Sequence, residues 1–114
     1  MLLEIVQRQV EPDITVVELS GKLALGRESQ RIEALADELV KRGCKRVVLV
    51  LVRVNHIDSA GVGMVALAAG KLKEAGCQLA VAVTEGRVLD VLNLTRISTI
   101  VTVCPTIDAA LAAV

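Results

Sequence analysis

The chain has 114 residues, which is room for one domain with its own core and too little for two. Hydrophobic residues make up 54% of it, yet Phe, Trp and Tyr are absent, so the core is expected to consist of Val, Leu, Ile and Ala. Thirteen basic residues balance thirteen acidic ones, and a neutral chain without aromatic side chains lacks the charge and stacking surfaces that nucleic acids require.

The cysteines and the apolar runs indicate a cytoplasmic protein. Cys44, Cys77 and Cys104 are odd in number and widely spaced, which is typical of reduced, mostly buried thiols rather than disulfides or metal ligands. The longest apolar runs, such as Val47–Val52, are far shorter than a membrane span. The apolar stretch near the N-terminus lacks the basic segment that begins a signal peptide. We therefore expect no membrane-spanning segment.

The first third of the chain predicts two antiparallel strands. Leu2–Val6 is followed by the turn-forming residues Glu11-Pro12-Asp13 and then by Ile14–Leu19, with only a short connection between them. Ser20-Gly21 is expected to end the second strand, and Lys22–Gly26 leads to a helix.

The middle of the chain predicts a helix and a buried strand. The helix carries a one-sided apolar stripe made of Ile32, Leu35, Ala36, Leu39 and Val40, and it is expected to end at Gly43. We interpret the nearby cations (Lys41, Arg42, Lys45 and Arg46) as partners of the helix C-terminus rather than as an anion-binding patch. Val47–Val52 is continuous and rich in β-branched residues, which is the pattern of a strand covered on both faces.

The remaining elements alternate between helices and strands. They are a helix over about Val62–Glu74, a strand at Gln78–Val83, a helix at Glu85–Leu94 capped by Thr84, a strand at Thr99–Val103 and a helix at Ile107–Ala113 capped by Thr106. The fold class is therefore α/β, a single domain with a mixed sheet of about five strands and about four helices in the order β-β-α-β-α-β-α-β-α.

The segment Asn55–Gly63 is the most informative part of the sequence, because binding sites of open α/β sheets form where a central strand ends and a helix begins. Asp58 or Ser59 is expected to cap the helix. Gly61 and Gly63 lack side chains, so another backbone can approach closely. A phosphate on Ser59 would meet unpaired N–H groups and a favourable helix dipole, while Asp58 would repel it. The same residues are also compatible with an N-cap and nothing more.

Four stretches of the sequence lie in the expected strands and helices in an order that is typical of one protein family. They are Val48–Leu51, Ile57–Gly63, Val88–Thr95 with Ile97, and Ala109–Leu111. With this pattern the chain resembles the anti-anti-sigma factor family, also called the STAS domain family, over essentially its whole length. The resemblance implies a bacterial regulator that binds an anti-sigma factor with serine kinase activity and thereby frees the sigma factor. The kinase phosphorylates a serine of the antagonist and releases it, and a PP2C-type phosphatase reverses the modification.

The resemblance assigns the phosphorylated serine to Ser59. It implies a partner-binding surface made of Lys22, Ala24, His56, Asp58, Ser59, Ala60, Gly61, Val62 and Gly63. ATP and its metal ion would belong to the kinase, so we expect no cofactor in this chain, which should be a monomer or a weak homodimer.

The chain departs from the family pattern at four places around this serine. Lys22-Leu23-Ala24 stands where an acidic residue is usual, and Val50 replaces a common Asp or Asn of the central strand. Ala60 replaces a frequent hydroxyl residue, and His56 stands where an apolar or aromatic residue is common. These departures concern kinase recognition more than the fold.

Two other functions remain open at the level of sequence. One is a STAS scaffold or regulatory subunit of a transport or signalling complex that is never phosphorylated. The other is an enzyme, but the sequence has no metalloprotease, nucleophile-elbow or phosphate-loop motif. His56 and Ser59 lie on a turn that does not constrain their relative geometry, so we expect binding rather than catalysis.

Overall fold

The computed structural model describes residues 3–10, 13–24 and 28–114, and for residues 28 and 29 it describes the backbone alone. The elements in chain order are β1 (Glu4–Val10), β2 (Ile14–Leu23), α1 (Glu28–Lys41), β3 (Arg46–Ile57), α2 (Ser59–Glu74), β4 (Gln78–Ala82), α3 (Arg87–Leu94), a short 3-10 helix η1 (Ile97–Thr99), β5 (Thr102–Cys104) and α4 (Ile107–Ala113). The strands form one sheet in the order β1-β2-β3-β4-β5. The pair β1–β2 is antiparallel and the other three pairs are parallel. This confirms the predicted fold class and element order.

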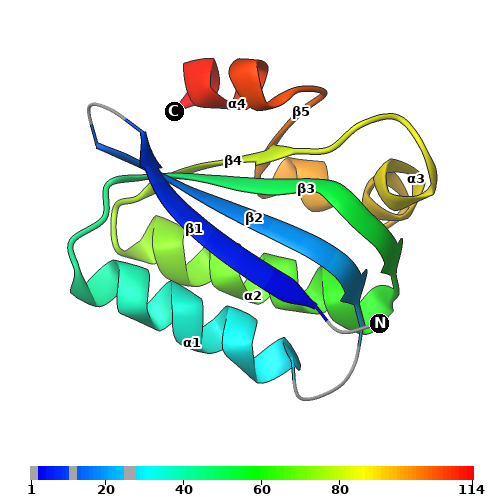
Figure 1. Ribbon diagram of the computed structural model, residues 1–114, viewed down its shortest axis with the longest axis horizontal. Coiled ribbons are helices and arrows are strands. Elements are labelled where there is room, and N and C mark those ends of the chain that lie inside the picture. Colours follow the sequence, from blue (N-terminus) through cyan, green and yellow to red (C-terminus); the bar gives the residue numbers. More distant parts are fainter. Residues whose placement is uncertain (1–2, 11–12, 25–27) are drawn as a thin grey trace.

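The sheet is covered on both faces. Helices α1 and α2 lie side by side against one face, and α4 lies across the other (Figure 1). Strand β3 shows the consequence, because Val47–Leu51 are all buried. Val47, Leu49 and Leu51 belong to the core beneath α1 and α2, whereas Val48 and Val50 belong to the core beneath α4. The prediction of a doubly covered strand is confirmed for Val47–Leu51, whereas Val52, the last residue of the predicted run, is 39% exposed.

Strand β2 is longer than predicted, and Ser20-Gly21 does not end it. The strand continues to Leu23 with two register irregularities against β3, between Glu18 and Ser20 and between Gly21 and Lys22. Gly21 has a φ of 95°, which a glycine adopts without steric cost and which suits a β-bulge. The extension follows from β3, which runs to Ile57 rather than Val52 and offers β2 a partner along its whole length.

The other boundaries differ by a few residues. β1 begins at Glu4 rather than Leu2, and of the turn Glu11-Pro12-Asp13 only the last residue lies within the described part of the chain. Helix α2 begins at Ser59, three residues before the predicted start, because Asp58 caps it.

The predicted cap of α3 is wrong. The helix begins at Arg87, its N-cap is Gly86 with a φ of 144°, and no side chain caps it, so Thr84 lies in the preceding loop. Strand β5 spans only Thr102–Cys104, because η1 occupies the residues before it and anchors them through the buried Ile97. The cap of α4 is confirmed, since the Ala109 N–H donates to the Thr106 hydroxyl at 3.0 Å.

Candidate functional site

The predicted site residues come together at the carboxyl ends of β2 and β3. Lys22 is the register partner of His56, and Leu23 is the partner of Ile57. The Asp58 N–H then donates to the Leu23 carbonyl oxygen at 3.4 Å, which holds the start of α2 against the end of β2. Lys22 and His56 are exposed, and Ala24 is half-buried. The end of β2 with the residue after it (Lys22–Ala24) therefore lies next to the segment His56–Gly63, and we call this region the corner.

The N-cap of α2 is Asp58, not Ser59. Asp58 has extended backbone angles, and its Oδ1 accepts the Gly61 N–H at 2.8 Å. Its carbonyl oxygen accepts the Val62 N–H at 3.0 Å, which begins the helical ladder. Because Asp58 carries the capping role, the side chain of Ser59 is not required for it, and Ser59 is exposed at the first helical position.

The two glycines of the turn have different roles. At Gly61 an added Cβ would lie 2.0 Å from the Leu23 carbonyl oxygen and 3.0 Å from Ile57 Cγ1, so only glycine fits there. At Gly63 an added Cβ would meet nothing within 4 Å. The predicted close backbone approach is therefore present at Gly61, where the backbone is the chain's own, whereas Gly63 borders open space.

The first turns of α2 present an exposed row of residues. Ser59, Gly63 and Leu67 are spaced four apart, which places them on one side of a helix, and all three are exposed. Leu67 keeps 48% of its surface exposed, which is high for a large apolar side chain. Ala60 is half-buried and Val62 is buried among core residues. The accessible surface next to Ser59 therefore has no side chain at Gly63 and an apolar side chain at Leu67.

Sequence reasoning did not single out Leu67, although its spacing from Ser59 was the signal that could have identified it. It also did not single out the loop Thr84–Gly86, which leads into α3 at Arg87. This loop borders a cavity of about 170 Å³. The cavity is also lined by Val83 after β4, by Val88 of α3 and by four residues of β3, namely Leu51, Val52, Val54 and Asn55. Strand β4 ends at Ala82, the register partner of Val50, and β3 continues beyond it to Ile57, so the cavity lies beside the part of β3 that β4 no longer pairs.

Most polar side chains of this corner are exposed to solvent. It holds a hydroxyl at a helix N-terminus, a capping carboxylate already bound to an N–H group, and the exposed side chains of Lys22 and His56. Among the residues that the structure describes, no three His, Cys, Asp or Glu side chains gather as a metal ion would need. None of the helices in those residues combines the length and the apolar character needed to cross a membrane.

Comparison with solved structures shows the same architecture in other proteins. An anti-sigma factor antagonist from Mycobacterium paratuberculosis superposes with a TM-score of 0.86 at 21% identity, covering 99% of this chain and 94% of that one. A sulfate transporter family protein from Wolinella succinogenes gives 0.78 at 23% identity, with 92% and 87% covered. The Bacillus cell fate determinant SpoIIAA in its phosphorylated form gives 0.71 at 17% identity, with 96% and 97% covered.

These identities are low, so the superpositions establish the fold alone. Comparison with proteins of curated function gives no match. The sequence model of the STAS domain, in contrast, matches residues 6–110, which include every strand from β2 to β5 and the whole of the corner described above. The chain therefore belongs to the STAS domain family.

Proposed function

We propose that this protein is an anti-sigma factor antagonist that binds an anti-sigma factor with serine kinase activity and is released when Ser59 is phosphorylated. The observation that carries the proposal is the position of Ser59. It is exposed at the first residue of α2, on the exposed row with Gly63 and Leu67, and Asp58 has taken over the capping role. Its hydroxyl is therefore accessible to a kinase without unfolding the helix.

The surface around Ser59 supports docking of a partner protein. The exposed row ends in Leu67, which would lose its remaining contact with water in a complex. Gly63 adds no side chain between Ser59 and Leu67, so a partner can lie close to the helix backbone. Gly61 and Val62 are buried and contribute by fixing the start of α2 rather than by touching a partner.

Phosphorylation would reverse docking through charge. A phosphate adds about −1.5 to −2 charge at neutral pH. It would stand beside the Asp58 carboxylate, which already occupies the Gly61 N–H that an anion at this helix end would otherwise bind. Two negative groups next to each other within an interface would weaken the complex.

One experiment tests this proposal directly. The purified protein is incubated with ATP, magnesium and each anti-sigma kinase of its native host, and the phosphorylated residue is mapped by mass spectrometry over a time course. We expect one phosphate on Ser59 in the wild type and none in S59A. Phosphate on another residue, or on none, would contradict the proposal.

A second function has a specific observation in its favour. The corner carries Lys22 and His56 where the family pattern has acidic and apolar residues, and a sulfate transporter family protein shares the fold. A STAS scaffold or regulatory subunit of a transport or signalling complex would use the same surface without phosphorylation. Such a protein would bind its native partner equally well as S59A and S59D.

A further inference from the structure

The helices α1 and α2 end in the same way. Gly43 and Gly76 adopt left-handed φ angles of 72° and 84°, and each is followed by a cysteine, Cys44 and Cys77. In both caps the glycine N–H and the cysteine N–H donate to helix carbonyls, at 3.0 and 3.1 Å after α1 and at 3.0 and 2.9 Å after α2. Because the two helices lie side by side (Figure 1), these identical caps deliver two cysteines to the same end of the sheet.

The two cysteines are in contact. The Cys77 thiol donates to the carbonyl oxygen of Cys44. The next residues are also joined, because the Gln78 N–H donates to the Lys45 carbonyl oxygen at 2.9 Å. Adjacent strands lie about 4.8 Å apart, and a disulfide needs Cα atoms about 4.4–6.8 Å apart. The β3–β4 register begins with Arg46 opposite Gln78, so Cys77 lies opposite Lys45 and is a diagonal neighbour of Cys44. The side chain of Cys44 is near enough to contribute to the raised pKa of the Cys77 thiol.

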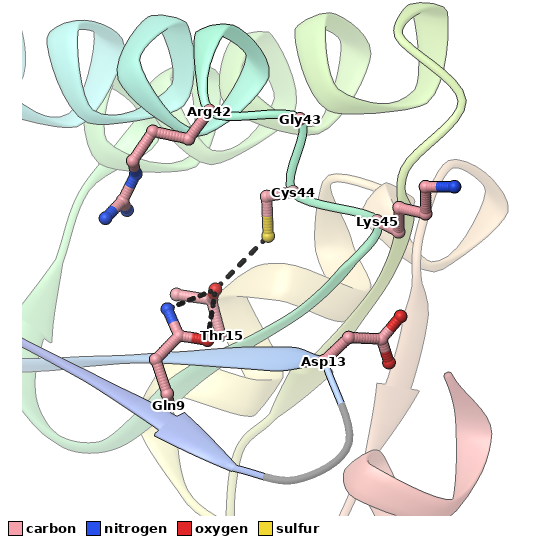
Figure 2. Close-up of a pocket in the computed structure, with 7 residues that line it drawn as sticks. All are labelled: Gln9, Asp13, Thr15, Arg42, Gly43, Cys44 and Lys45. Atoms are coloured by element: carbon pink, nitrogen blue, oxygen red, sulfur yellow. Dashed lines mark hydrogen bonds between the residues drawn. The ribbon is translucent and has the colours of Figure 1, made fainter.

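The two thiols differ in accessibility. Cys77 is buried, and burial followed by the nearby Cys44 raises the pKa of its thiol. Cys44 is only half-buried, and Figure 2 shows its thiol directed toward Thr15, whose hydroxyl oxygen lies 3.2 Å from the sulfur. An external reagent therefore reaches Cys44 first, and Cys77 stands behind it.

Cys44 also borders an open cavity of about 500 Å³. Its other lining residues are Gln9, Asp13, Thr15, Arg42, Gly43 and Lys45 (Figure 2). Of the charged lining residues, Asp13 is paired with Arg46 at 3.6 Å and Arg42 with Glu38 at 3.9 Å. Lys45 therefore remains as the lining cation without an ion pair in the part of the chain that the structure describes. The cavity therefore favours a small reagent that carries carboxylates.

We propose that Cys44 is a modification site for the disulfide of a small carboxylate-bearing thiol, and that Cys77 converts the adduct into a Cys44–Cys77 disulfide. The Cys44 sulfur attacks one sulfur of the reagent, the reagent's disulfide breaks, and the first small thiol leaves with the proton of Cys44. The Cys77 sulfur then attacks Cys44, and the second small thiol leaves with the proton of Cys77. The protein loses two protons and two electrons, and the reagent is reduced to two thiols.

The test uses the full chain, reduced and then treated with oxidised glutathione, with intact mass and peptide mapping over time. We expect the wild type to lose two hydrogens and to link Cys44 with Cys77. C77S should accumulate a mixed disulfide on Cys44, and C44S should remain unmodified over the same period. C104S is the matched control, because Cys104 lies in the core on the other face of the sheet, and it should behave as the wild type.

Circular dichroism of each reduced variant shows whether it has folded. If a variant does not fold, the disulfide formed by the wild type still tests the proposal. A wild type that stays reduced, or whose disulfide involves Cys104, would overturn the proposal. The uncharged reagent hydroxyethyl disulfide tests the ligand class. We expect K45Q to slow the reaction with oxidised glutathione about tenfold and to leave the neutral reagent unaffected. Equal slowing with both reagents would contradict the preference for carboxylates.

Discussion

Gly61 lies so close to Leu23 that a Cβ added at position 61 would stand 2.0 Å from the Leu23 carbonyl oxygen. This contact joins the end of β2 to the first turn of α2, and it is reinforced by the hydrogen bond from the Asp58 N–H to the same oxygen. The position of Ser59 relative to Lys22 and His56 therefore depends on a backbone contact that only glycine permits.

The first prediction compares the two glycines of the turn. G61A should destabilise the protein by about 3 kcal/mol, because the new methyl group meets backbone that cannot move aside. G63A should be neutral or stabilising by up to about 1 kcal/mol, since its methyl group meets open space in a helix. Urea unfolding of the two variants measures the difference. Equal stabilities would show that the contact with Leu23 is absent.

The second prediction concerns the cap of α2. D58A removes the acceptor of the Gly61 N–H and should lower the free energy of unfolding by about 1 kcal/mol. D58N keeps an acceptor oxygen and should retain most of that stability. Urea unfolding measures both variants, with S59A as the comparison. Because Ser59 does not cap the helix, S59A should lower the free energy of unfolding less than D58A does.

The third prediction concerns Leu67 as part of the docking surface. L67S should weaken binding of the native partner roughly tenfold, because about half of an apolar side chain no longer becomes buried. V6S is the matched control, since Val6 is 50% exposed and borders a cavity with Ile107 of α4, on the opposite side of the sheet. Calorimetric titration of the partner should separate the two variants, while both keep the stability of the wild type within about 0.5 kcal/mol. A loss of affinity in V6S but not in L67S would place the docking surface elsewhere.

The fourth prediction concerns the ion pairs between α1 and α2. Lys71 Nζ lies 2.8 Å from Asp37 Oδ1 and 3.2 Å from Glu33 Oε1, and these hydrogen-bonded carboxylates raise the pKa of Lys71. A raised pKa means that the folded state favours the charged amine, so this stabilisation is present below the unfolded pKa of about 10.4 and is lost as the pH rises through the folded value. K71M should therefore lose less stability than the wild type as the pH rises above about 10.4. Parallel pH curves for the two proteins would refute this, and added salt should reduce the difference at neutral pH.

Much of the fold follows from local pattern. The apolar stripe from Ile32 to Val40 and the run Val47–Val52 are properties of contiguous residues, and both identify their elements. Ser59 could be placed at a helix N-terminus because Asp58 precedes it within the same segment. Features that depend on pairing between distant residues could not be read in this way. The bulge at Gly21 exists because β3 continues alongside it, so an isolated Ser-Gly dipeptide looked like the end of a strand.

In the candidate site, too, features of contiguous residues could be predicted, whereas contacts between distant residues could not. The turn Asp58–Gly63 was visible in the sequence, but the different roles of Gly61 and Gly63 depend on Leu23, which lies far away along the chain. Thr84 was expected to cap α3, but the loop extends to Gly86, whose left-handed φ no propensity argument identified. The contact between Cys44 and Cys77 arises only because α1 and α2 pack side by side.

The central claim is that the charge on Ser59 controls binding, and the most direct measurement is the affinity of the native anti-sigma factor for four forms of the protein. These are the wild type, S59A, S59D and the wild type phosphorylated on Ser59. We expect S59A to bind within about threefold of the wild type, because it loses neither the cap nor the exposed row. The phosphorylated form should bind about ten- to hundredfold more weakly, with S59D between the two because it carries less charge and fewer acceptor oxygens. Equal affinity of all four forms would contradict the account and leave a constitutive STAS scaffold.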